Sequence, residues 1–226
     1  APMAGWSMRS LGLACAFVVI LIQSALASQL NVALTRAAMS GDLAGVRKAL
    51  ADGADINASA DQSGQAPLMA ATLAGHADIV KFLLQAGADV TVGEKDGYTP
   101  MHGAAFQGRP EVAQALLDAG VDPNSKHRDG YLPLHRGCWG GKDNHNAFLK
   151  VLLSKDEVNV DAQSKHEGST CLMEALKRGH RKTVKLLVTK FGANLDIRDK
   201  QGMTAHDYDV NGWLKKFANK SKKAEL

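Results

Sequence analysis

The sequence is poor in aromatic residues and lacks the short motifs of the common enzyme classes. Aromatic residues make up 5% of the 226 residues, a share that suits helices packed through Ala and Leu better than a sheet sandwich. No Gly-rich phosphate loop, His-Glu-x-x-His motif or Ser or Cys nucleophile signature occurs. We therefore expect no catalysis and no cofactor. The net charge of +4 is spread along the chain except at its end, so we expect no nucleic-acid partner.

A unit of fixed length recurs along the chain. Pro67, Pro100 and Pro133 are spaced 100 − 67 = 33 and 133 − 100 = 33 residues apart, and a glycine precedes each proline by three residues. Self-similarity at such a period indicates a repeat architecture. In the central unit, Thr99 is predicted to cap a helix that starts at Pro100 and ends at Gly108.

This unit resembles the ankyrin repeat. The family pattern Thr-Pro-Leu-His-x-Ala, on a period of 33, is matched by Thr99 to Ala104, with Met101 in place of Leu. The resemblance implies an all-α fold, namely an α-solenoid of stacked helix-turn-helix repeats with β-hairpin or turn connections. It also implies a structural, hydrogen-bonding role for His102 and His135, which occupy the family's histidine position.

The chain divides into an N-terminal segment at residues 1–27, a repeat domain at 28–218 and a basic tail at 219–226. About five repeats are expected, at 30–60, 61–93, 94–126, 127–164 and 165–198, with a partial unit at 199–218. The fourth repeat is longer, because Pro133 and its counterpart Cys171 are 171 − 133 = 38 residues apart. Insertions in repeats map to loops. We therefore expect three of the additional residues in a polar loop within Lys142–Asn146, between the two helices.

The first 27 residues have the features of a secretory signal peptide. Arg9, the apolar run Leu11–Ile22 and the small residues Ala25–Ala27 form its three regions, and cleavage is expected after the last alanine. An uncleaved membrane anchor and a buried helix are the alternatives. We therefore expect a secreted or endoplasmic reticulum lumen protein, the alternative being a membrane-anchored or cytoplasmic one. The terminus Lys223–Leu226 resembles the retrieval signal of that compartment, with Ala in place of the acidic residue.

Cys138 and Cys171 are the cysteines that remain if this segment is removed. An oxidising compartment favours a disulfide, but Cys138 lies 138 − 133 = 5 residues into its helix, whereas Cys171 opens the next one. With a rise of about 1.5 Å per residue and helices about 8–10 Å apart, their Cα atoms should lie beyond the limit of about 7 Å. We expect two free, buried thiols. His135 and Cys138 have a usable spacing for a metal, but a zinc site needs further ligands, so no metal is predicted.

The predicted binding surface is the concave face formed by the hairpins and helices. The family pattern places there four rings of the third and fourth repeats: Tyr98, Phe106, Tyr131 and Trp139. Aromatic residues and Arg dominate interface energetics, so we expect these rings to contact a partner. Arg128, Lys177 and Arg178 should favour acidic groups on that partner. The alternative is that the rings pack the hairpins against the helices within the fold.

The resemblance implies a non-catalytic module that binds another protein through this face. We expect a monomer, with membrane contact only if the N-terminal helix is uncleaved. In that case the protein would be a membrane-tethered adaptor or targeting subunit, which is the alternative function.

Overall fold

The computed structural model describes residues 8–59, 65–92 and 98–217, with side chains from residue 17 onward. The tail at 219–226, with its Lys-Ala-Glu-Leu terminus, lies outside the described residues. Within them no strand forms, and the hairpin connections carry one isolated bridge, Gln163–Thr170. In chain order the helices are α1 Met8–Ser40, α2 Leu43–Ala51, α3 Pro67–Ala74, α4 Ala77–Gln85, α5 Pro100–Gln107, α6 Pro110–Asp118, α7 Pro133–Gly140, α8 Asp143–Leu152, α9 Cys171–Lys177, α10 Arg181–Lys190 and α11 Ala205–Tyr208.

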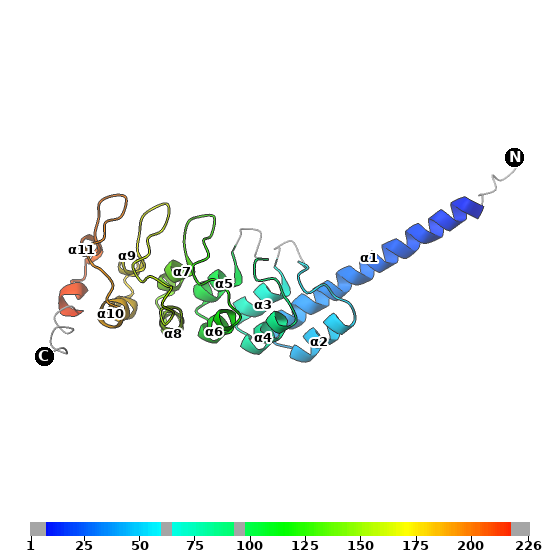
Figure 1. Ribbon diagram of the computed structural model, residues 1–226, viewed down its shortest axis with the longest axis horizontal. Coiled ribbons are helices and arrows are strands. Elements are labelled where there is room, and N and C mark those ends of the chain that lie inside the picture. Colours follow the sequence, from blue (N-terminus) through cyan, green and yellow to red (C-terminus); the bar gives the residue numbers. More distant parts are fainter. Residues whose placement is uncertain (1–7, 60–64, 93–97, 218–226) are drawn as a thin grey trace.

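The helices form two rows along the molecule (Figure 1). The first helices of the repeats, α3, α5, α7 and α9, lie next to the hairpin loops, and the second helices, α2, α4, α6, α8 and α10, form the row farther from them. Each helix contacts the equivalent helix of the next repeat, as α5 contacts α7 and α6 contacts α8. This is the all-α solenoid that the repeat period predicted.

Local sequence signals set the helix ends. Helix α5 starts at Pro100, after an extended Thr99. It ends at Gly108, whose φ of 63° is a left-handed conformation that favours glycine. The Thr99 hydroxyl does not bond the helix backbone as predicted, but lies 2.8 Å from Nδ1 of His102.

Each repeat buries its apolar residues against its neighbours. Leu83 of α4 and Leu116 of α6 are fully buried, and one continuous apolar cluster runs from Leu34 in α1 to Phe217 near the end of the described chain. Burying each such leucine contributes about 1.5–3 kcal/mol. Adjacent hairpins are also joined, since the backbone N–H of Lys165 donates to the carbonyl of Gly130 at 3.0 Å. The solenoid is therefore held along both its helices and its loops.

The fourth repeat differs from the prediction. Helix α8 begins 143 − 133 = 10 residues after the start of α7, as α6 begins 110 − 100 = 10 residues after the start of α5. The predicted loop within Lys142–Asn146 is therefore mostly the first turn of α8, where His145 is buried. The prediction was wrong because it aligned Leu152 with Leu116, whereas the buried Leu149 occupies that place. The additional residues lie in α8, which has 10 residues against 9 in α6, and in the connection to α9.

Cys138 and Cys171 form a disulfide between α7 and α9, so the prediction of two free thiols was wrong. Their Cα atoms are 5.6 Å apart. The prediction used the distance between helix axes, but Cα atoms on facing sides are closer than the axes by two helix radii of about 2.3 Å each. It also assumed that the two helices start level. The Sγ of Cys171 instead lies 3.6 Å from the carbonyl oxygen of Leu134, which is one turn before Cys138.

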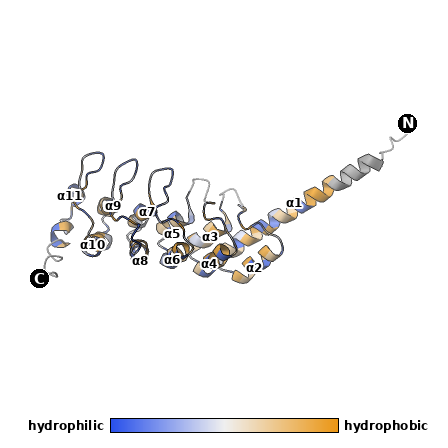
Figure 2. Cartoon of the chain, viewed as in Figure 1, coloured by the Kyte–Doolittle hydropathy of each residue, from blue (hydrophilic) through white to orange (hydrophobic). Residues whose placement is uncertain are grey.

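Helix α1 is continuous and belongs only in part to the solenoid. Its C-terminal part buries Leu34 and Ala38 in the first repeat. Its N-terminal part is apolar and projects beyond the repeats (Figures 1 and 2), where Phe17 and Ile22 are each 62% exposed. The stretch Phe17–Ser40 is long and apolar enough to cross a membrane, with a mean hydropathy of 1.8. A membrane anchor and a signal sequence both meet this description.

Candidate protein-binding surface

Two predicted binding residues have their backbone fixed by the following repeat. Phe106 and Trp139 lie at position six of their repeats, counted from the first residue of α5 or α7. The Phe106 carbonyl lies 3.0 Å from Nε2 of His145, and the Trp139 carbonyl lies 2.8 Å from Nε2 of His180, so each accepts a hydrogen bond from the next repeat. In both cases a histidine of one repeat fixes the backbone of a predicted binding residue in the repeat before it.

Three predicted rings meet around Arg136, a residue that the prediction did not include. The centre of its guanidinium group lies 4.1 Å from the Trp139 ring centroid, 4.8 Å from that of Tyr98 and 5.3 Å from that of Tyr131. The rings of Tyr131 and Trp139 pack edge to face at 5.0 Å. Arg136 is only 4% exposed and pairs with Asp129. Such cation–π contacts contribute about 0.5–2 kcal/mol each. We call Arg136 and these three rings the Arg136 cluster.

Glu174 of α9 joins this cluster to the predicted cations. Its carboxylate accepts hydrogen bonds from the Trp139 indole at 2.8 Å, the Ser169 hydroxyl at 2.7 Å, Lys177 at 3.3 Å and Arg178. Burial alone would raise the pKa of Glu174. The Ser169 hydrogen bond and the two cations outweigh burial, and the pKa is lowered. Glu174 is therefore ionised at neutral pH.

The cations on this face are largely balanced by carboxylates of the same face. Lys177 also contacts Glu167 at 3.4 Å, and Arg128 is exposed in the hairpin before α7. The charged side chains around the cluster are four cations and three carboxylates, a net charge of 4 − 3 = +1: Arg128, Arg136, Lys177, Arg178, Asp129, Glu167 and Glu174. The predicted preference of this face for acidic groups on a partner therefore has less support than the types of Arg128, Lys177 and Arg178 alone suggested.

Phe106 is the predicted ring that stays open to solvent, at 54% exposure. A cavity of about 240 Å³ lies beside it between α3 and α5, lined also by Met69, Leu73, Tyr98 and Gly103. This is several times the roughly 30 Å³ that a water molecule occupies in the liquid. The cavity is mostly apolar and has room for an apolar side chain from a partner. Tyr98, by contrast, stacks on His127 at 4.1 Å and so takes part in packing within the fold.

The two residues that the sequence analysis missed occupy the same place in consecutive repeats. Arg136 and Glu174 lie at position three, since 136 − 133 = 3 and 174 − 171 = 3. In the two preceding repeats, Ala70 and Gly103 hold that position. A charged residue at a position that holds a small residue in the other two repeats is the sequence signal that could have identified Arg136 and Glu174.

The histidines at the family position have the predicted structural role. Both are fully buried. Nε2 of His102 lies 3.2 Å from the Tyr131 carbonyl, and Nε2 of His135 lies 3.0 Å from the Ser169 carbonyl. Burial lowers the pKa of His102 to about 4 and also lowers that of His135, so both rings are neutral at pH 7. The described part of the chain contains no group of three or more His, Cys, Asp or Glu side chains placed to hold a metal ion.

Comparison with known proteins agrees with this architecture. The family described as Ankyrin repeats (3 copies) matches residues 34–127, 87–164 and 134–210. These matches span more than half of the chain, which therefore belongs to the ankyrin-repeat family. Ankyrin repeats are generally protein–protein interaction modules and are typically non-catalytic.

Two curated relatives share parts of the repeat region. The chain is 48% identical over 56 residues to "Arf-GAP with coiled-coil, ANK repeat and PH domain-containing protein 3" of Homo sapiens. The matched region covers 24% of this chain and 7% of that protein. The chain is 38% identical over 69 residues to "Probable 26S proteasome regulatory subunit p28" of Saccharomyces cerevisiae, which covers 30% of each. The similarity thus extends over less than a third of either relative.

Proposed function

We propose that the protein is a non-catalytic module that binds another protein along the hairpin and first-helix face of its third and fourth repeats. The observation that carries the proposal is the exposed Phe106 beside an apolar cavity of about 240 Å³, next to the Arg136 cluster. Interfaces commonly have an aromatic and Arg centre surrounded by polar residues. The partner would place an apolar side chain in the cavity.

The Arg136 cluster would form a preordered contact surface beside this cavity. Its rings are held by the guanidinium group, and Trp139 is fixed further by its hydrogen bond to Glu174 at 2.8 Å. Side chains that are ordered before binding lose little conformational entropy on association. The nearly balanced charges around the cluster would select the orientation of the partner more than its overall charge.

The test begins with affinity capture and mass spectrometry to identify a partner, followed by titration with Phe106→Ser. Because Phe106 is 54% exposed, this change should cost less than about 0.5 kcal/mol in stability. It should weaken binding by about 1–2 kcal/mol. Val210→Ser is the matched control, since Val210 is 87% exposed and lies outside the proposed surface. Unchanged affinity for Phe106→Ser would refute the proposed contact.

Trp139 requires a separate measurement, because it also packs within the fold. A loss of affinity below about 1 kcal/mol for Trp139→Ala, with the fold intact, would remove Trp139 from the interface. The circular dichroism spectrum of the variant checks the fold.

A second candidate is a membrane-tethered adaptor, favoured by the exposed apolar part of α1. A secreted or lumenal protein is supported by the Cys138–Cys171 disulfide, since disulfides persist in oxidising compartments. Cleavage after Ala27 is also compatible with the fold, because the buried residues of α1 start later, at Leu34. N-terminal sequencing of the expressed protein separates the two. A start at Ser28 excludes the tether, whereas an intact N-terminus in the membrane fraction supports it.

A further inference from the structure

Charge divides the repeat region into two unlike halves. Residues 30–141 contain 9 Lys and Arg and 12 Asp and Glu, a net charge of 9 − 12 = −3. Residues 142–218 contain 14 Lys and Arg and 10 Asp and Glu, a net charge of 14 − 10 = +4. The overall charge of +4 conceals this asymmetry, which indicates that the C-terminal half meets a partner of different chemistry.

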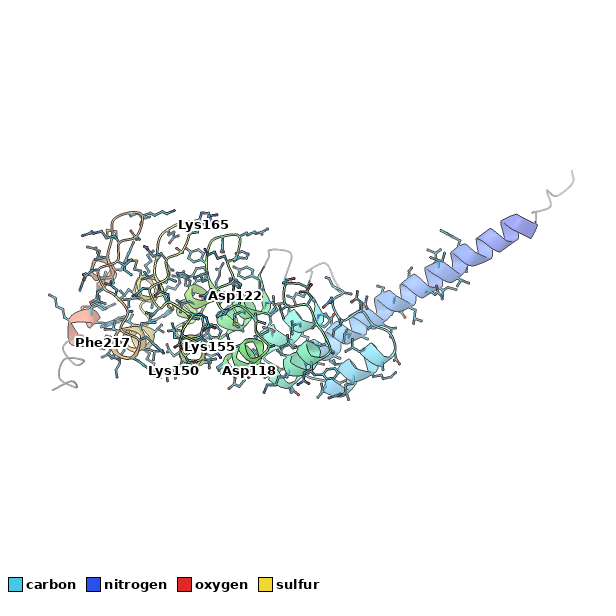
Figure 3. All side chains as sticks on the ribbon, in the orientation of Figure 1. Asp118, Asp122, Lys150, Lys155, Lys165 and Phe217 are labelled. Atoms are coloured by element: carbon cyan, nitrogen blue, oxygen red, sulfur yellow. A yellow bond between two sulfur atoms is a disulfide. The ribbon has the colours of Figure 1, made fainter. Side chains whose placement is uncertain are left out.

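Part of this positive charge lies in a groove between the second helices of the fourth and fifth repeats. This groove, of about 440 Å³, lies between α8 and α10 and is lined by Lys150, Lys182 and Lys185, with one acidic residue, Asp143. Asp143 pairs with Lys182 at 2.8 Å. Lys150 and Lys185 are exposed and form no ion pair with a described carboxylate. Lys150 points away from the hairpin side, where Lys165 is labelled (Figure 3).

The chain contains a matched groove with a different charge. Between α4 and α6, two repeats earlier, a groove of about 460 Å³ is lined by one lysine, Lys81, and one acidic residue, Asp118. Its Leu84 corresponds to Lys150, since 84 − 67 = 17 and 150 − 133 = 17. The matched groove has one lysine where the α8–α10 groove has three. Two of these three lysines are therefore additional to what the architecture requires.

The first turn of α10 also carries a cation where the helix dipole disfavours one. Asp78 in α4 and Glu111 in α6 lie in the first turn, where the helix dipole favours negative charge. The equivalent residue of α10 is Lys182, because 78 − 67 = 11, 111 − 100 = 11 and 182 − 171 = 11. The first turn of α10 contains no acidic residue. A locally unfavourable charge of this kind is expected at functional positions.

We propose that the α8–α10 groove is a second interaction surface, which binds an acidic segment of a protein. A protein segment fits better than a membrane because of where the groove lies on the solenoid. The apolar part of α1 leaves the opposite end of the solenoid, so a bilayer that held α1 would be remote from α10 (Figure 1).

The test compares two single charge reversals at the same repeat position. Lys185→Glu changes the α8–α10 groove, and Lys81→Glu changes the matched groove, since 185 − 171 = 14 and 81 − 67 = 14. Both variants alter the net charge of the full chain equally. The probe is a fluorescein-labelled poly-glutamate peptide, with binding measured by anisotropy at low and high ionic strength. Circular dichroism confirms that each variant is folded.

We expect Lys185→Glu to weaken peptide binding about fivefold or more at low salt, and Lys81→Glu to change it less than about twofold. Equal effects of the two variants, or no effect of either, would overturn the proposal. A second arm uses co-sedimentation with phosphatidylserine and phosphatidylcholine vesicles, in which any insertion of α1 is common to wild type and variants. If Lys185→Glu reduces binding to the anionic vesicles while the wild type does not bind the peptide, the surface is a lipid site and the proposal fails.

Discussion

Glu174 offers the sharpest test of the electrostatics of the proposed binding face. Replacing it with Gln keeps the size of the side chain and one carbonyl oxygen, but removes the charge. The side chains of Lys177 and Arg178 are 26% and 37% exposed, so each ion pair contributes only about 0.5 kcal/mol. Ser169 and Trp139 donate to different oxygens of Glu174. The single oxygen of Gln can accept from the Trp139 indole while the Ser169 hydroxyl turns to accept from the new amide, and each of these two hydrogen bonds weakens by roughly 0.5 kcal/mol. The expected loss is about 2 kcal/mol, or a fall in Tm of about 4–8 °C.

The sign of the pH dependence makes this prediction specific. The pKa of Glu174 is lowered in the folded protein from its ordinary value of 4.5. Its contribution is therefore fully present well above pH 4.5 and is lost as the pH falls through the folded pKa. Wild type and Glu174→Gln should differ by about 2 kcal/mol at pH 7 and converge on acidification.

The assay is urea unfolding followed by circular dichroism at pH 7, 5 and 3.5. Asp52→Asn is the control. Asp52 pairs with Lys48 at the same i, i+4 spacing as Glu174 and Arg178, but both side chains of this pair are exposed, Lys48 at 76% and Asp52 at 44%. This control should lose less than about 0.5 kcal/mol. A loss for Glu174→Gln that is equally large at pH 3.5, or no larger than that of the control at pH 7, would refute the reasoning.

Two further predictions concern buried groups. Cys138→Ser removes a disulfide that closes a loop of 33 residues, and it should lower the free energy of unfolding by about 3–4 kcal/mol relative to oxidised wild type. Thermal melts with and without reductant check this. A variant that is less stable than reduced wild type would show that lost packing, and not the lost disulfide, is the cause. His102 has a folded pKa of about 4 against 6.5, so the unfolded state binds its proton first and stability falls as the pH drops from 6.5 to 4, by up to about 3 kcal/mol. His102→Gln should flatten urea-derived stability over that range, and an unchanged slope would contradict the assignment.

The sequence predicted the repeat fold well, because its signals are local. The prolines that open α3, α5 and α7 and the glycines that end them act within a single turn of helix, so their spacing sets the helix bounds. Errors arose where the answer depended on alignment or on tertiary geometry. The loop expected within Lys142–Asn146 came from a misplaced leucine. The Cys138–Cys171 disulfide depends on the offset between two packed helices, which no local signal gives.

The candidate site was predicted in part for a similar reason. The family pattern selected Phe106, which lies beside Tyr98 at the cavity, and Trp139, which packs on Tyr131. It did not reveal that Arg136 and Glu174, both almost fully buried, would contact Trp139. A buried charge is determined by partners that are distant in sequence, since Trp139 and Glu174 are 35 residues apart. The contribution of each ring to binding stays a prediction.

The unbroken course of α1 has a mechanical consequence. An α-helix resists bending over such a length, and no hinge separates the solvent-facing Phe17 from the packed Leu34. As long as α1 is intact, any surface that binds its apolar end also fixes the orientation of the whole array of repeats. A single proteolytic cut that removes that end would leave the array of repeats free to rotate relative to such a surface.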